Sequence, residues 1–142
     1  TAAKAYAVMW NTMDASVIEP FLDNDVRNES QNILEPIVGK NNLMDYLHSK
    51  LSTIRNGLPA TQPFVELARF QGRTCLTMAQ GQKEPPGAVI LLTTENGKVK
   101  GIDLCTVVPT PEQVERTGIY PNKTEKPGLF SKLIRLFKSK VI

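Results

Sequence analysis

The sequence has few of the residues that identify metalloproteins and disulfide-rich proteins. One histidine and two cysteines in 142 residues are too few for a structural zinc site or a disulfide framework. Nucleophile elbows, phosphate-binding glycine loops and CxxC pairs are also missing. We therefore expect a protein that needs no cofactor and no metal. Cys75 and Cys105 are predicted to be free, buried thiols.

Long apolar runs are missing too. No stretch reaches the roughly 18 residues that predict a membrane span, and no charged and then apolar leader is present. Together with the scarcity of cysteine, this favours a cytoplasmic protein. The sequence begins at Thr1 rather than Met, so a leader removed before it stays an open alternative.

Positive charge is unevenly distributed. Residues 122–142 hold six of the 17 Lys and Arg residues but one of the 14 Asp and Glu residues, and the remaining chain is slightly acidic. This excludes a general nucleic-acid-binding surface on the body of the protein. Residues 127–142 alternate apolar and basic positions in a helical pattern. We expect a basic amphipathic helix at about 129–141 that contacts a membrane surface or another protein, or that folds back onto the body.

The periodicity of apolar residues predicts helices before strands. Helices are expected at 3–13, at 16–22 and at 41–56, and a strand begins near residue 25. Further strands are expected at 64–71, 73–80, 87–94 and 98–108, with a hairpin turn at Asn96-Gly97. Pro109 and Pro111 are predicted to end the sheet. Helices that precede a run of antiparallel strands indicate an α+β fold with helices on one face of a curved sheet.

The strand near residue 25 is unusual because DVRNES, residues 25–30, has almost no apolar face. With this segment, the VGK of residues 38–40 and the ENGKVKGID of residues 95–103, the order of elements resembles the nuclear transport factor 2-like superfamily. That superfamily includes SnoaL-like polyketide cyclases and ketosteroid isomerase. The resemblance implies a cone-shaped fold, in which a curved, mostly antiparallel sheet wraps on N-terminal helices. We expect this domain at residues 1–109 and a C-terminal extension at residues 110–142.

Comparison with ketosteroid isomerase argues against its chemistry in this chain. Tyr6 matches the family's helix-one tyrosine, but the two aspartate positions of the family fall on Ser30 and Val89. Proton abstraction beside a ketone needs a base, and a serine does not supply one.

The resemblance also explains the polar strand. With Ser30 at the family's catalytic position, Val26, Asn28 and Ser30 face into the cone, whereas Arg27 and Glu29 point outward. The predicted lining of a ligand pocket is Tyr6, Trp10, Asn28, Ser30, Phe64, Val89, Leu91, Ile102, Leu104 and Thr106. The alternative is that the apolar members of this set fill the cone as an ordinary core.

Three other ionisable residues have structural interpretations. His48, beside the apolar stripe of the third helix, is predicted to be partly buried. Asp103 and Glu29 are expected on the outer face of the sheet. There a homodimer would form, with an interfacial salt bridge from Asp103 to Arg69 or Arg73.

The sequence thus predicts a small-molecule-binding protein of the SnoaL-like type that holds a largely apolar ligand in the cone. Whether it also has cofactor-free isomerase, cyclase or hydrolase activity is left open. The alternative is a non-enzymatic dimeric interaction module whose basic tail docks on a partner or a membrane surface.

Overall fold

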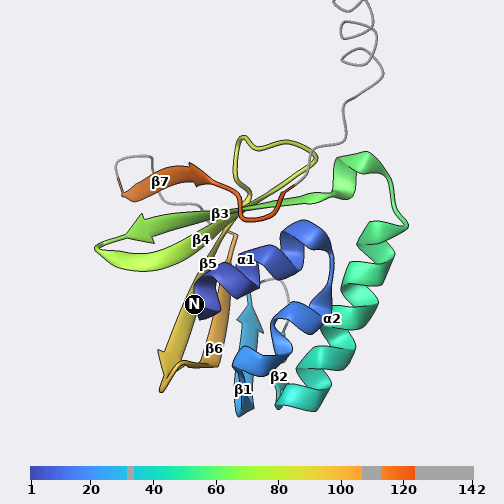
Figure 1. Ribbon diagram of the computed structural model, residues 1–142, viewed down its shortest axis with the longest axis vertical. Helices are drawn as coiled ribbons and strands as arrows, with labels where there is room; N and C mark the ends of the chain where they lie inside the picture. Colours follow the sequence, from blue (N-terminus) through green and yellow to red (C-terminus); the bar gives the residue numbers. More distant parts are fainter. Residues whose placement is uncertain (32–33, 107–112, 124–142) are drawn as a thin grey trace, which may run out of the picture.

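The computed structural model describes residues 1–31, 34–106 and 113–123. Within these ranges the strands form one sheet of seven in the order β2-β1-β6-β5-β4-β3-β7. The sheet curves around two helices (Figure 1). The helices are α1 (Ala2–Thr12) and α2 (Lys40–Arg55), with short 3₁₀ turns η1 (Ala15–Val17), η2 (Glu19–Phe21) and η3 (Pro59–Thr61). The strands are β1 (Leu22–Ser30), β2 (Ile37–Val38), β3 (Pro63–Phe70), β4 (Arg73–Gln80), β5 (Ala88–Glu95), β6 (Lys98–Cys105) and β7 (Val114–Ile119).

The two long helices lie where the apolar periodicity predicts them. In α1 the stripe that contains Tyr6, Met9 and Trp10 is buried, and the helix packs on β3 and β4. In α2 the predicted stripe is buried throughout, and the helix packs on β1 and β2. Gly39, with φ of 95°, supplies the turn that leads into α2. The α+β cone fold predicted from the sequence is confirmed.

The polar strand β1 lies between β2 and β6 and has the two faces that the sequence predicts. Val26 is fully buried in the core, and Arg27 and Glu29 are exposed and ion-paired with each other. Strand β1 runs parallel to β6, whereas the other described strand pairs are antiparallel. The Asn96-Gly97 turn between β5 and β6 has φ of 53° and 76°, as the predicted two-residue hairpin requires.

The sheet does not end at Pro109, contrary to the prediction. Strand β7 follows the two prolines and pairs antiparallel with β3. Its sequence contains a single buried apolar residue, Val114, so hydrophobic periodicity could not reveal it. The helix predicted at about 129–141 lies outside the described residues, and the division into a domain and an extension stays a prediction.

The buried side chain of Asn11 joins three segments of the chain. Its Oδ1 accepts a hydrogen bond from Val65 N at 2.7 Å. Its Nδ2 donates to Val65 O and to Pro121 O, each at 2.9 Å. Asn11 is 4% exposed, so these backbone groups have no access to water as a substitute. The amide therefore holds α1, β3 and the segment after β7 together.

Replacing Asn11 with Leu is expected to lower the free energy of unfolding by about 3 kcal/mol. The change leaves a backbone N–H and two carbonyls without this partner, and each buried unsatisfied group costs about 1–3 kcal/mol. Urea unfolding followed by circular dichroism measures the effect. Asn24→Leu, at an exposed position on β1, is the control. Equal stability of the two variants would contradict the role given to Asn11.

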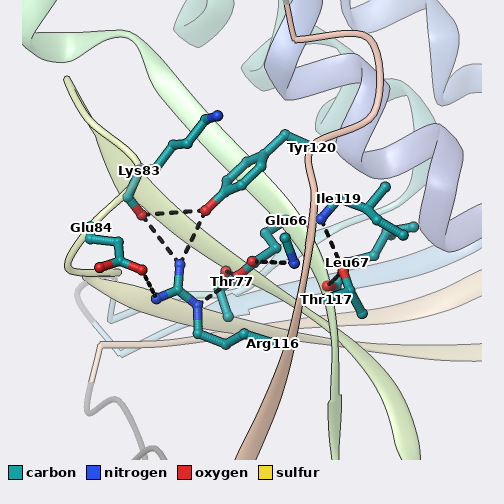
Figure 2. Close-up of polar contacts among 10 residues, drawn as sticks. Glu66, Leu67, Thr77, Lys83, Glu84, Arg116, Thr117, Ile119 and Tyr120 are labelled. Carbon is teal, nitrogen blue, oxygen red and sulfur yellow. Dashed lines mark hydrogen bonds and ion pairs between the residues drawn. The ribbon is translucent and has the colours of Figure 1, made fainter.

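A buried ion pair attaches β7 to the outer face of the sheet, as Figure 2 shows. Glu66 on β3 is 1% exposed, and its Oε1 accepts from Arg116 Nε at 2.8 Å and from Thr77 Oγ1 at 2.9 Å. Its Oε2 accepts from the backbone N of Gly118 at 2.8 Å. Arg116 also donates to Glu84 Oε1 at 2.9 Å and to the Tyr120 hydroxyl at 3.1 Å. This network gives β7, which has little apolar surface of its own, a specific attachment to β3.

Replacing Arg116 with Met is expected to lower the free energy of unfolding by about 2 kcal/mol. The substitution leaves the Glu66 carboxylate buried without a counter-charge, which is costly, although the partial exposure of Arg116 moderates the loss. Thermal unfolding compared with Arg69→Met, an exposed position on the same sheet, measures it. If the two variants unfold at the same temperature, the ion pair does not stabilise β7.

Candidate functional site

A cavity of about 530 Å³ lies between α2, the ends of β1 and β6, and the connection between β4 and β5. Five of the ten predicted site residues line it: Trp10, Asn28, Ser30, Leu104 and Thr106. The other described lining residues are Tyr46, Lys50, Ile54, Pro63, Met78, Ala79, Gln80, Pro85, Gly87 and Ala88. The predicted set therefore contains a third of the described lining of this cavity, and the ligand-binding role given to these residues stays a prediction.

The sheet side of the cavity depends on the parallel pairing of β1 with β6. The register places Ser30 opposite Leu104, so that residues distant in sequence share one wall. Gln31 secures the ends of both strands. Its backbone N donates to Leu104 O at 3.2 Å, and its Oε1 accepts from Thr106 N at 2.8 Å and from Thr106 Oγ1 at 3.0 Å.

The helical side of the cavity comes from one flank of α2, which sequence reasoning missed. Tyr46, Lys50 and Ile54 are spaced four residues apart, so they lie above one another on the helix. They run beside the buried stripe that contains Leu47 and Leu51. The spacing was visible in the sequence, but nothing local distinguishes a flank that faces a cavity from one that faces solvent.

Trp10 lines the cavity, but its polar atom is enclosed by the protein. The residue is 6% exposed, and its indole Nε1 is buried without a partner of good hydrogen-bond geometry among the described residues. The Tyr6 hydroxyl is the neighbour toward which Trp10 acts as a hydrogen-bonding group, and this interaction opposes the rise in the pKa of Tyr6. The apolar part of the Trp10 ring is therefore what this residue contributes to the cavity wall.

Two predicted site residues belong to the core rather than to the cavity lining. Ile102 is 1% exposed and Tyr6 is 2% exposed, and both pack in the main hydrophobic cluster. Burial raises the pKa of the Tyr6 phenol to about 12, with a smaller contribution from Trp10 in the opposite direction and from Tyr46 in the same direction. Tyr6 is thus a neutral side chain of the core close to two residues of the cavity.

Val89 and Leu91 do not face the cone, contrary to the prediction. The register of β5 and β6 pairs Ile90 with Leu104 and Leu92 with Ile102, so these even-numbered residues of β5 face inward. Val89 and Leu91 lie on the outer face in a separate cluster with Ala68, Cys75 and Val114. Both faces of β5 are apolar, so alternation could not choose between them.

Phe64 also lies on the outer face, where its ring packs edge-on against Tyr120 at a centroid distance of 6.4 Å. Lys123 Nζ lies 4.4 Å from the same ring centroid. The inward residues of β3 are instead Val65 and Leu67, which join the main core. The segment after β7 covers the apolar outer face of β3 at Phe64. The sequence analysis did not predict this contact.

The remaining candidates lie away from the cavity. His48 is exposed rather than partly buried. Glu29 and Asp103 are neighbours across β1 and β6; partial burial and the nearby Glu29 raise the pKa of the Asp103 carboxyl. Asp103 has no ion pair among the described residues, and the dimer contact expected for it stays a prediction. Both cysteines are free; Cys75 is buried and Cys105 is half-buried.

The described lining of the cavity contains few ionisable side chains. Its described residues include one charged side chain, Lys50, and none of them is Asp, Glu or His. The described part of the chain contains no group of three or more His, Cys, Asp or Glu residues that could hold a metal ion. Within the same residues, no helix is both long and apolar enough to cross a membrane.

Comparison with known proteins identifies the fold. No protein-family model matches the chain, and no curated protein matches its sequence. A nuclear transport factor 2-like protein of unknown function from Burkholderia xenovorans is 21% identical. That comparison covers 92% of this chain and 88% of the other, with a TM-score of 0.50. A proposed ketosteroid isomerase from Kribbella flavida is 16% identical, over 87% of this chain and 93% of the other, with a TM-score of 0.53.

A de novo designed protein with a curved β-sheet is also similar. It is 16% identical, over 98% of this chain and 95% of the other, with a TM-score of 0.52. The chain therefore has the nuclear transport factor 2-like fold, as the sequence resemblance implied. At this level of identity the comparisons establish architecture alone, since one fold serves many functions.

Replacing Tyr6 with Phe is expected to flatten the loss of stability at alkaline pH. The pKa of Tyr6 is raised from 10.0 to about 12 in the folded protein. Its contribution is therefore complete below pH 10 and is lost as the pH rises toward 12. A shift of this size corresponds to about 2–3 kcal/mol. Urea unfolding of both proteins between pH 9 and pH 12 tests this; parallel stability profiles would contradict it.

Proposed function

We propose that the protein binds a small, largely apolar organic molecule in the cavity, and that it does so without acid–base catalysis. The observation that carries this proposal is a cavity of about 530 Å³ whose described lining combines apolar side chains with uncharged polar groups.

The size and composition of the cavity support this proposal. Ligand sites commonly measure about 300–1,000 Å³ and combine mainly apolar walls with a few polar groups that orient the ligand. Here Ile54, Met78 and Leu104 supply apolar surface, while Asn28 and Thr106 supply polar groups. The walls come from α1, α2 and the sheet, so rigid elements rather than loops position most of the lining.

The lining also favours binding over isomerisation. General-base catalysis requires a group of suitable pKa within hydrogen-bond distance of the proton that it removes. Ser30, which faces the cavity at the position of the family's catalytic base, has no Asp, Glu or His beside it among the described lining residues. We therefore place the protein among binding members of this fold.

The single tryptophan of the chain makes the proposal directly measurable. Because Trp10 lines the cavity, a molecule that enters it is expected to change the intrinsic fluorescence. We suggest titrations with decanoate, decanamide and decylamine, and with 4-cyclohexylbutanoate and its amide and amine counterparts. We expect saturable changes with at least one probe at concentrations below its self-association.

Replacing Ser30 with Phe fills part of the cavity and is expected to weaken binding at least tenfold. Glu29→Phe is the matched control because it adds the same ring one residue earlier, on the exposed side of β1. Loss of binding in the Ser30 variant alone would support the site. If no probe changes the fluorescence of the unmodified protein, or if both variants bind equally, the cavity is not a ligand site of this kind.

A further inference from the structure

The ionic character of the cavity points to a narrower class of ligand. We propose that the ligand is an organic monocarboxylic acid, with its apolar body inside the cavity and its carboxylate paired with Lys50. This proposal rests on the proposed binding function and adds the charge of the ligand to it.

Lys50 is a cation whose immediate surroundings contain no acid. Its neighbours one turn away on α2 are Tyr46, Leu47, Thr53 and Ile54, and none of these carries a negative charge. No ion pair of Lys50 with a described residue is present, whereas Lys100 and Arg116 each contact two acids. The ammonium group at the cavity therefore lacks a protein counter-ion.

The other walls of the cavity do not supply a counter-ion for Lys50. The described lining from the sheet and from the connection between β4 and β5 contains no Asp or Glu. The nearest acid of β1, Glu29, is on the opposite face and is already paired with Arg27. Lys50 is exposed, so water partly screens its attraction for an anion, and we expect a modest contribution from this contact.

The uncharged polar groups of the cavity are compatible with a carboxylate. The side-chain amides of Asn28 and Gln80 can each donate or accept hydrogen bonds, and both residues line the cavity. A carboxylate would accept from these amides, whereas the ammonium group of an alkylamine would be repelled by Lys50. The charge of Lys50 therefore decides the sign of the ligand, and the amides accommodate it.

Apolar walls limit the rest of the molecule. Trp10, Ile54, Met78, Ala88 and Leu104 can contact an alkyl chain or a ring, and each buried methylene contributes about 0.8 kcal/mol. Small inorganic anions would leave this surface unused, and a dianion would meet only one cation in the described lining. The structure therefore favours a single carboxylate on an apolar body.

The decanoate, decanamide and decylamine series tests the proposal, because the three probes share a chain and differ in charge. With the unmodified protein, decanoate is expected to bind about three- to tenfold more tightly than decanamide, and decylamine most weakly. Lys50→Gln is expected to remove the advantage of decanoate over decanamide and to leave the affinity for decanamide unchanged. A three- to tenfold preference for decanoate over decanamide is the contribution expected of one exposed, charge-assisted contact.

Lys4→Gln is the charge-matched control, because it removes the same charge from an exposed position at the start of α1. It should leave the affinities for all three probes unaltered.

Each outcome separates this proposal from the one on which it rests. Binding of decanamide equal to or tighter than that of decanoate would overturn the carboxylate assignment while leaving the cavity a ligand site. Equal weakening of both probes by Lys50→Gln would also overturn the carboxylate assignment, because it would show that Lys50 acts through packing and not through its charge. Failure of every probe to bind would overturn the proposed function itself.

Discussion

The parallel pairing of β1 with β6 is the constraint on which the rest of the structure depends. Strands β3 to β6 follow one another along the antiparallel sheet, but β1 comes from the N-terminal part of the chain and joins the sheet beside β6. This pairing carries α2 along, because α2 follows β1 and packs on it. The helix then faces the ends of both strands, and the cavity lies between them. Without the pairing of β1 with β6, Ser30 and Lys50 would not line the same cavity.

The two faces of the curved sheet differ in character. On the outer face, the buried Glu66 carboxylate pairs with the partly exposed Arg116 and connects β7 to β3 (Figure 2). On the inner face, the core closes around Val26 and Ile102 and then gives way to the cavity near Ser30. The Glu66 network is closed by groups of the protein, whereas the inner face leaves an open volume beside Ser30.

The fold was largely predictable because its local patterns are strong. The stripes of α1 and α2 and the Asn96-Gly97 turn each specify their conformation within a few residues. Five of the ten predicted site residues do line one cavity, and Asn28 and Ser30 are among them because β1 has one apolar residue near them, Val26, to determine which face turns inward. The errors arose where both faces of a strand are apolar. In β3 and β5 the alternation separates the residues into two faces, but it does not show which face turns toward the core. Phe64, Val89 and Leu91 were therefore predicted on the wrong face. A one-residue error in register reverses every side chain of a strand.

The sequence by itself determined the helices, most strands and the polar character of β1, because these depend on residues near one another in the chain. The sequence also contains none of the motifs typical of a metalloprotein or of a hydrolase with a nucleophilic residue. The tertiary structure alone decided that β7 extends the sheet and that the flank of α2 with Tyr46, Lys50 and Ile54 faces a cavity. Each of these depends on contacts between segments that are distant in sequence. Such contacts are set by strand register and by the direction in which a sheet curves, and no local pattern encodes either of them.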